Sequence, residues 1–217
     1  MSYSPFIVPY QQLPETLPIF PLPGAIVMPG SELPLNIFEP RYLNMVSDAL
    51  STHRMIGMIQ PDRYARNENA LCRAGCAGRI TQYRETSDGR IEMVLSGVCR
   101  YDVGEELPTT RGYRLIVPDW SRFADDYADQ DSVLRGEHGR LIRALKRYFA
   151  VKELQADWNM LERLSTVRLM NSLSMALPLS EQDKQVLLES IHPEERLQAF
   201  IAVIHSEVAV PKLLIRH

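Results

Sequence analysis

The segment 17–42, LPIFPLPGAIVMPGSELPLNIFEPRY, constrains the fold most, because proline and glycine interrupt its apolar residues at short intervals. Each proline fixes φ and removes a backbone donor, and each glycine permits positive φ. We therefore predict short strands joined by rigid turns rather than long helices. Leu33, Leu35 and Ile37 alternate with their neighbours, which predicts a strand with one face in a core.

A helix is expected directly after this strand. In Glu39-Pro40-Arg41-Tyr42, the proline stands where the first turn of a helix has no use for a backbone N–H. Apolar residues then recur at helical spacing, so the sequence predicts a helix from about Pro40 to Leu50 with one apolar face.

Strand patterns continue to about residue 120, and helical patterns follow. Asp88-Gly89 marks a hairpin turn between two of the strands. The chain has no glycine after Gly139, which is typical of a helical bundle. Within it, Ser180 is a predicted N-cap and Pro193 the predicted first residue of the last helix. The predicted strands are Met55–Gln60, Gly78–Arg84, Ile91–Leu95, Val98–Val103 and Tyr113–Val117.

A polar acidic run, DDYADQD at 125–131, separates these two patterns. It has no apolar period, and its composition is that of a linker. We predict a β-rich domain at 1–122, an acidic linker at 123–131 and an α-helical subdomain at 132–217.

The segment 17–42 resembles the opening of the Lon amino-terminal domain, the substrate-recognition module of the ATP-dependent Lon protease. Residues 56–59 (IGMI), 75–80 (GCAGRI) and 94–101 (VLSGVCRY) follow in the order and spacing of that domain. The resemblance covers nearly the whole chain. It implies an α+β fold: a twisted antiparallel β pseudo-barrel of the PUA-like type with one embedded helix, followed by a C-terminal α-helical bundle. It also implies a stand-alone bacterial member of the family.

The marks of a complete Lon protease are not found in the sequence. No G-x-x-x-x-G-K-[ST] motif is present to bind nucleotide phosphates, and no segment corresponds to a Ser–Lys peptidase. We therefore expect no enzyme activity, no catalytic residue and no cofactor or metal. The function that the resemblance implies is a non-enzymatic protein-binding module for exposed apolar or unfolded polypeptide segments in protein quality control. Its expected partners are client proteins and an ATP-dependent protease acting in trans.

The charge pattern bears on two other classes of partner. The net charge of the 217 residues is −3, and neither half has the basic excess that binding a phosphate backbone requires. Nucleic acid is not expected, although RNA binding stays an alternative because PUA-like domains elsewhere bind RNA. No apolar run approaches the ~20 residues that cross a bilayer, and no signal peptide is recognisable. We expect a cytoplasmic protein without a membrane partner.

Three cysteines are the candidates for metal or thiol chemistry. Cys72, Cys76 and Cys99 lack the paired spacing of a structural zinc site, and we interpret them as small apolar residues of a sheet. A thiol activated by His53 or His138 would make a hydrolase, the less favoured alternative.

Two surface segments remain. Phe38, Glu39, Arg41 and Tyr42 are the candidate polypeptide-binding residues, at the edge of a groove beside the proline-rich turns. The alternative is that they fasten the helix to the sheet.

The second segment is a predicted helix at 133–152, on which Arg140, Arg143 and Arg147 share a face. This face could bind an acidic partner or phosphate. We interpret it as a solvated surface balanced by the preceding aspartates.

Overall fold

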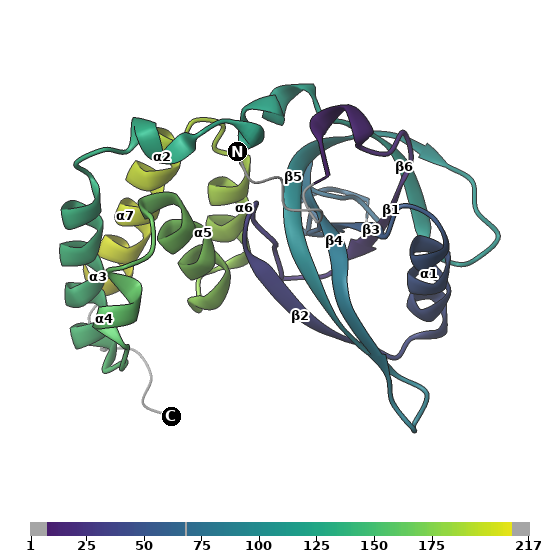
Figure 1. Cartoon of the computed structure of the whole chain (residues 1–217), viewed down its shortest axis with the longest axis horizontal. Coiled ribbons are helices and arrows are strands. Elements are labelled where there is room, and N and C mark those ends of the chain that lie inside the picture. The colour runs from purple at the N-terminus through teal and green to yellow at the C-terminus, as the bar shows by residue number, and fades with distance from the viewer. Residues whose placement is uncertain (1–7, 68, 210–217) are drawn as a thin grey trace.

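The computed structural model describes residues 8–67 and 69–209 and contains a β-barrel followed by a helical subdomain (Figure 1). The outer limits of the two predicted domains lie outside the described residues. The strands are β1 (Leu17–Pro21), β2 (Glu32–Ile37), β3 (Met55–Ile59), β4 (Ala74–Glu85), β5 (Ile91–Leu107) and β6 (Arg114–Asp119).

The sheet closes on itself through its longest strand. Its order is β2-β5-β4-β3-β1-β6, and β5 pairs with β6 as well, so that all strands but β2 form a ring. The first half of β5 pairs with β2 and β4, and its second half pairs with β4 and β6. Register shifts at Ala77/Gly78 and Ile80/Gln82 bend β4, because a bulge increases the local twist.

One strand pair is parallel. Ile19 of β1 pairs with Gly57 of β3 in the same direction, and β2 and the helix after it form the crossover. The other pairings in the sheet are antiparallel, so the sheet is mixed. The α+β pseudo-barrel is confirmed, with this one departure from an antiparallel sheet.

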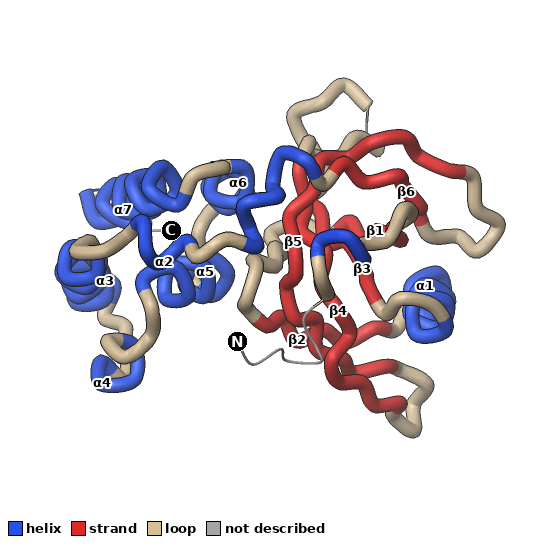
Figure 2. The backbone as a smooth tube through the Cα atoms, turned by 45° about the horizontal axis from the view of Figure 1, so that its top comes forward, coloured by secondary structure: helices blue, strands red, loops and turns tan. Residues whose placement is uncertain are grey.

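The helices surround the barrel on two sides. Figures 1 and 2 show α1 on the side of the barrel opposite to the helical subdomain. The helices are η1 (Tyr10–Gln12), α1 (Pro40–Ser51), η2 (Ser121–Tyr127), α2 (Gln130–Val133), α3 (His138–Lys152), α4 (Trp158–Leu161), α5 (Thr166–Ala176), α6 (Glu181–Glu189) and α7 (Pro193–Ala209).

Apolar burial fixes α1 and α6 against the barrel. Tyr42, Met45 and Val46 of α1 lie in one core with residues of the sheet, to which α6 contributes Leu188. A separate core joins α3, α5, α6 and α7. The buried Gln60 of the barrel donates from Nε2 to the carbonyl oxygen of Glu181 at 2.9 Å. The helical subdomain is thus attached to the barrel by α6.

Most predicted elements are present at the predicted places. The helix after the proline-rich segment begins at Pro40, Ser180 accepts a hydrogen bond from the backbone N–H of Asp183 at 3.0 Å, and α7 begins at Pro193. In the predicted hairpin, Gly89 has a φ of 79°.

Two predicted boundaries are wrong. The strands predicted at 91–95 and 98–103 are one strand, β5, because Gly97 lies within the ladder instead of ending it. The helix predicted at 133–152 begins only at His138, as α3, because the chain turns after α2 ends at Val133, with Gly136 at a φ of 88°. The predicted linker contains the end of η2 and the start of α2, and the proposed domain limits stay a prediction.

Candidate functional site

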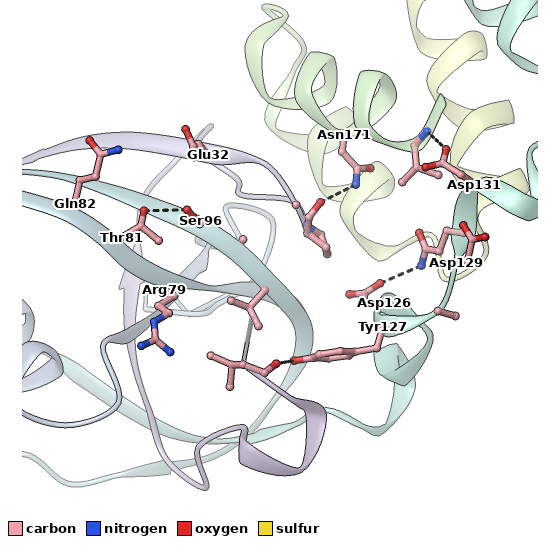
Figure 3. A pocket seen from close by; sticks show the side chains of 18 residues that line it. Glu32, Arg79, Thr81, Gln82, Ser96, Asp126, Tyr127, Asp129, Asp131 and Asn171 are labelled. Atoms are coloured by element: carbon pink, nitrogen blue, oxygen red, sulfur yellow. Dashed lines mark hydrogen bonds between the residues drawn. The ribbon is translucent and has the colours of Figure 1, made fainter. Parts of the chain in front are cut away.

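An open groove of about 730 Å³ lies where the barrel meets the helical subdomain (Figure 3). Strands β4 and β5 form its floor, the turn before β2 forms one wall, and the segment from η2 to α2, together with α5, forms the other. It is larger than four other pockets of the described residues, whose volumes are about 200, 600, 450 and 600 Å³.

A glycine on the floor brings the first wall close. The backbone N–H of Gly97 donates to Ser31, and the N–H of Gly30 donates to Gly97, at 2.8 and 3.0 Å. A Cβ atom at Gly97 would lie 2.1 Å from the carbonyl oxygen of Met28, so a side chain there has no room. The turn at 28–31 is therefore held directly against β5.

The second wall is held by polar side chains that bond to backbone. Asp129 accepts from the N–H of Ser132 as the N-cap of α2, and Asp131 accepts from the N–H of Val167 at 3.0 Å. Asn171 of α5 donates from Nδ2 to the carbonyl oxygen of Pro29 at 3.1 Å and thereby joins the two walls (Figure 3).

Three side chains in the groove have no such partner. No side-chain hydrogen bond or ion pair within the described part of the chain involves Arg79 or Gln82 of β4, or Glu32 of β2. By contrast, the hydroxyl groups of Thr81 and Ser96 bond to each other at 2.9 Å (Figure 3). The groove thus presents a cation, an amide and a carboxylate that are free to bind a ligand carrying both donors and acceptors.

A strand edge begins at the groove. The pairs between β3 and β4 end at Met55↔Arg79, and from Gln82 to Glu85, within the described residues, β4 pairs with β5 alone. The edge of β2 contains Pro34, which lacks a backbone donor, so β4 offers the better edge for an added strand.

A buried ion pair lies beside the groove and fixes its geometry. Arg100 of β5 and Asp126 of η2 are at most 1% exposed, and Arg100 Nη2 lies 2.6 Å from Asp126 Oδ1. The same guanidinium donates to the carbonyl oxygens of Leu188, Ser190 and Ile191 at the end of α6. Barrel, groove wall and α6 are therefore joined by one side chain.

The predicted candidates lie elsewhere, at the start of α1, and three of them contact one another. Arg41 Nε donates to Glu39 Oε2 at 3.0 Å, and its guanidinium lies 4.5 Å from the ring centroid of Tyr42. Tyr42 is buried against Phe20, and this burial raises its pKa. The fourth candidate, Phe38, is 60% exposed, and the guanidinium of Arg90 lies over its ring.

These contacts show helix-to-sheet attachment for Tyr42. A small pocket of about 200 Å³ includes Arg41 and Tyr42 in its lining, while Phe38 lies outside it. A polypeptide-binding role for Phe38, Glu39, Arg41 and Tyr42 stays a prediction.

The cysteines have the environment of structural residues. Burial raises the pKa of Cys76 and Cys99, and that of the half-buried Cys72 to about 11. His53 and His138 bond to the N–H of Met55 and to Thr166 Oγ1. Within the described part of the chain, no three histidine, cysteine, aspartate or glutamate side chains gather closely enough to hold a metal ion.

Comparison with known proteins identifies the family. The model of the ATP-dependent protease La (LON) substrate-binding domain matches residues 16–206. The chain belongs to this family. A Lon N-terminal domain protein from Xanthomonas campestris superposes with a TM-score of 0.64 at 26% identity, covering 86% of this chain and 97% of that one. The N-terminal domain of Mycobacterium avium complex Lon protease shares the fold at 19% identity, with a TM-score of 0.63 over 88% of this chain and 98% of that one.

The curated relatives are much longer Lon proteases from bacteria. Lon protease 2 of Thermus thermophilus is 25% identical over 91% of this chain, and Lon protease of Elusimicrobium minutum is 24% identical over 93%. The chain spans about a quarter of the length of each. The Lon family match therefore describes a substrate-binding domain rather than a catalytic one. Among residues 8–67 and 69–209, no helix has the length and apolar character to cross a membrane.

Sequence reasoning missed the groove because its residues come from distant parts of the chain. Glu32, Arg79 and Gln82 stand in ordinary strand patterns, and the opposite wall begins only at Asp126. Gly97 was the one local signal, since a glycine inside a strand often marks a close approach of backbone.

Proposed function

We propose that this Lon-family domain is a non-enzymatic recognition module that binds exposed apolar or unfolded polypeptide segments in the groove between β4, β5 and α2. The observation that carries the proposal is the set of unpartnered side chains Arg79, Gln82 and Glu32 beside an open strand edge. The lining also includes apolar residues, among them Val98 and Val167.

The proposed complex is an extended segment that follows β4. Main-chain groups of Thr81–Glu85 bind the backbone of the segment, and this contact accepts many sequences because it uses no client side chain. Val98 and Val167 contact its apolar side chains, and Arg79 and Glu32 bind its carbonyl and N–H groups. This arrangement suits a protein that must recognise unfolded chains of varied sequence.

The cellular role that we propose is protein quality control in the cytoplasm, with client proteins as partners and an ATP-dependent protease acting in trans. The family match and the similar bacterial proteins named above, which are Lon proteases, support this role. An RNA partner is less favoured, because the groove carries Glu32, Asp129 and Asp131, whose charges repel a phosphate backbone.

The test measures binding of a fluorescent, permanently unfolded polypeptide by anisotropy. Arg79→Glu removes a free donor from the groove, and we expect affinity to fall about tenfold, or ~1.4 kcal/mol. The matched control is Arg66→Glu, which reverses an exposed arginine that has no ion-pair partner within the described part of the chain and lies outside the groove lining. Equal losses in both variants would point to general electrostatics and contradict the proposed site.

A third variant separates the two candidate surfaces. Phe38→Ala with Arg41→Ala removes the exposed side chains of the predicted polypeptide-binding segment at the start of α1. We expect the affinity for the unfolded polypeptide to stay within about a factor of two. If this double variant abolishes binding while Arg79→Glu does not, the binding site lies at the start of α1 and the assignment of the groove fails.

A further inference from the structure

A second groove, of about 450 Å³, lies between α3 and α7. Figures 1 and 2 show these two helices at the end of the helical subdomain away from the barrel. Its lining residues are Arg140, Arg143, Ala144 and Arg147 of α3, and Gln198, Ile201, Ala202 and His205 of α7.

The groove has an apolar floor and a cationic rim. Ala144 and Ile201 are buried between the two helices, and the adjacent small side chain of Ala202 leaves the hollow open. Arg143 and Arg147 are exposed on the α3 side. Lys152 Nζ at the C-terminal end of α3 lies 2.7 Å from Glu207 Oε2 near the C-terminal end of α7. The two helices therefore run in the same direction.

The cations of α3 differ in their pairing. Lys146 is paired with Glu162 and Lys152 with Glu207, each at 2.7 Å. Arg143 and Arg147 have no carboxylate partner among residues 8–67 and 69–209. Arg140 reaches Glu137 at 3.3 Å on an exposed surface, a pair that contributes little.

The aspartates before α3 form no ion pair with this rim among the described residues. Asp126 is buried against Arg100, and Asp129 and Asp131 accept from backbone N–H groups of α2 and α5. The interpretation of this face as a solvated surface balanced by the preceding aspartates stays a prediction. Within the described part of the chain, Arg143 and Arg147 keep their positive charges on the rim of the groove without a direct carboxylate contact.

We propose that this groove binds an acidic amphipathic helix from a partner protein. Apolar side chains of the partner contact the floor at Ala144 and Ala202, and its glutamates pair with the arginines. Arg140, Arg143 and Arg147 are spaced i, i+3, i+7, which matches glutamates at the same spacing along a helix lying beside α3. The apolar floor at Ala144 and Ile201 favours this occupant over a nucleic acid, because a phosphate backbone has no apolar side chains to bury there.

The probe is a synthetic peptide of ~16 residues with an apolar stripe flanked by glutamates, long enough to form helix. Anisotropy measures its affinity for the whole chain, beside an analogue in which glutamine replaces each glutamate. We expect the glutamine peptide to bind about tenfold more weakly, and added salt to weaken the acidic peptide.

Variants locate the site. Arg143→Glu with Arg147→Glu reverses the charge of two rim residues, and we expect the affinity for the acidic peptide to fall at least about tenfold. Arg163→Glu with Arg168→Glu is the matched control, and we expect a change within about a factor of three. Both arginines are exposed, have no ion-pair partner among residues 8–67 and 69–209, and lie outside the groove. Ala202→Trp fills the groove without changing its charge and should also weaken binding about tenfold.

Three outcomes overturn the proposal: equal binding of both peptides, unchanged affinity in the reversed-rim variant and in Ala202→Trp, or tighter binding of a single-stranded oligonucleotide than of the acidic peptide. The Arg79→Glu variant should bind the acidic peptide normally, so failure here is distinct from failure of the proposed β4 groove.

Discussion

Two arginines on neighbouring strands of the barrel have opposite environments. Arg100 of β5 is buried, pairs with Asp126 and donates to three carbonyl oxygens at the end of α6 and directly after it. Arg79 of β4 lies in the groove beside this junction, and its side chain has no hydrogen-bond or ion-pair partner within the described part of the chain.

The difference separates structural polar groups from those available for binding. A buried cation must have its donors satisfied, and the partners of Arg100 hold the subdomain in place. A partly exposed cation without a partner holds nothing in place, so it is free to meet a ligand. Residue type and strand pattern are the same in both cases, and only the partners distinguish them.

The largest expected effect is at the junction. Arg100→Met leaves Asp126 buried without its main counter-charge, and we expect the free energy of unfolding to fall by about 3–5 kcal/mol. Denaturant titration followed by circular dichroism measures the loss. A change below about 1 kcal/mol would mean that α6 is held to the barrel mainly by apolar contacts such as Leu188, and the comparison of the two arginines would lose its basis.

The thiols should show the same contrast between interior and surface. Because burial first, and then nearby carboxylates, raise the pKa of Cys72 from 9.0 to about 11, its thiolate fraction at pH 7.5 is about a hundredfold below that of a free thiol. We expect labelling by a thiol reagent to be slower by that factor, and Cys76 and Cys99 to react only after unfolding. Mass spectrometry of labelled peptides measures each site.

Fast labelling of Cys76 or Cys99 in the folded protein at neutral pH would contradict this expectation and revive the cysteine hydrolase alternative.

The pH dependence of the free energy of unfolding follows from the same pKa shifts. The raised pKa values favour the folded state below pH 9, and this stabilisation is lost as the pH rises above 9, where the thiols of the unfolded chain ionise.

The smallest expected effect on stability is at Arg79. Arg79→Met removes a charge without a partner, and we expect the free energy of unfolding to stay within about 0.5 kcal/mol of the wild type. The same denaturant titration provides the measurement, with Arg100→Met as its counterpart. A large destabilisation would show that Arg79 is structural and would weaken the assignment of the groove.

Local signals in the sequence were sufficient for the elements and their order. Pro40 begins α1, Ser180 caps α6, and Pro193 begins α7, each as predicted, because proline and a capping hydroxyl act within one helical turn. The barrel was predicted from the resemblance to the Lon amino-terminal domain, because local patterns do not show which strands pair to close a sheet.

Long-range partners explain what sequence reasoning missed. The parallel pairing of Ile19 with Gly57 depends on a crossover through β2 and α1. Arg100 meets Asp126 across 26 residues and Leu188 across 88, so a run that reads as an acidic linker contains a buried carboxylate. Arg79 differs from the paired arginines only in lacking a partner, which no spacing in the sequence reveals.

Site-specific photo-crosslinking tests the binding of polypeptide in the β4 groove most directly. A photoreactive residue replaces Gln82 in the groove, Arg66 outside it, or Phe38 beside α1, and each protein is irradiated with the unfolded polypeptide. The account predicts strong crosslinking from position 82 and little from positions 66 and 38. Crosslinking from position 38 without any from position 82 would contradict it.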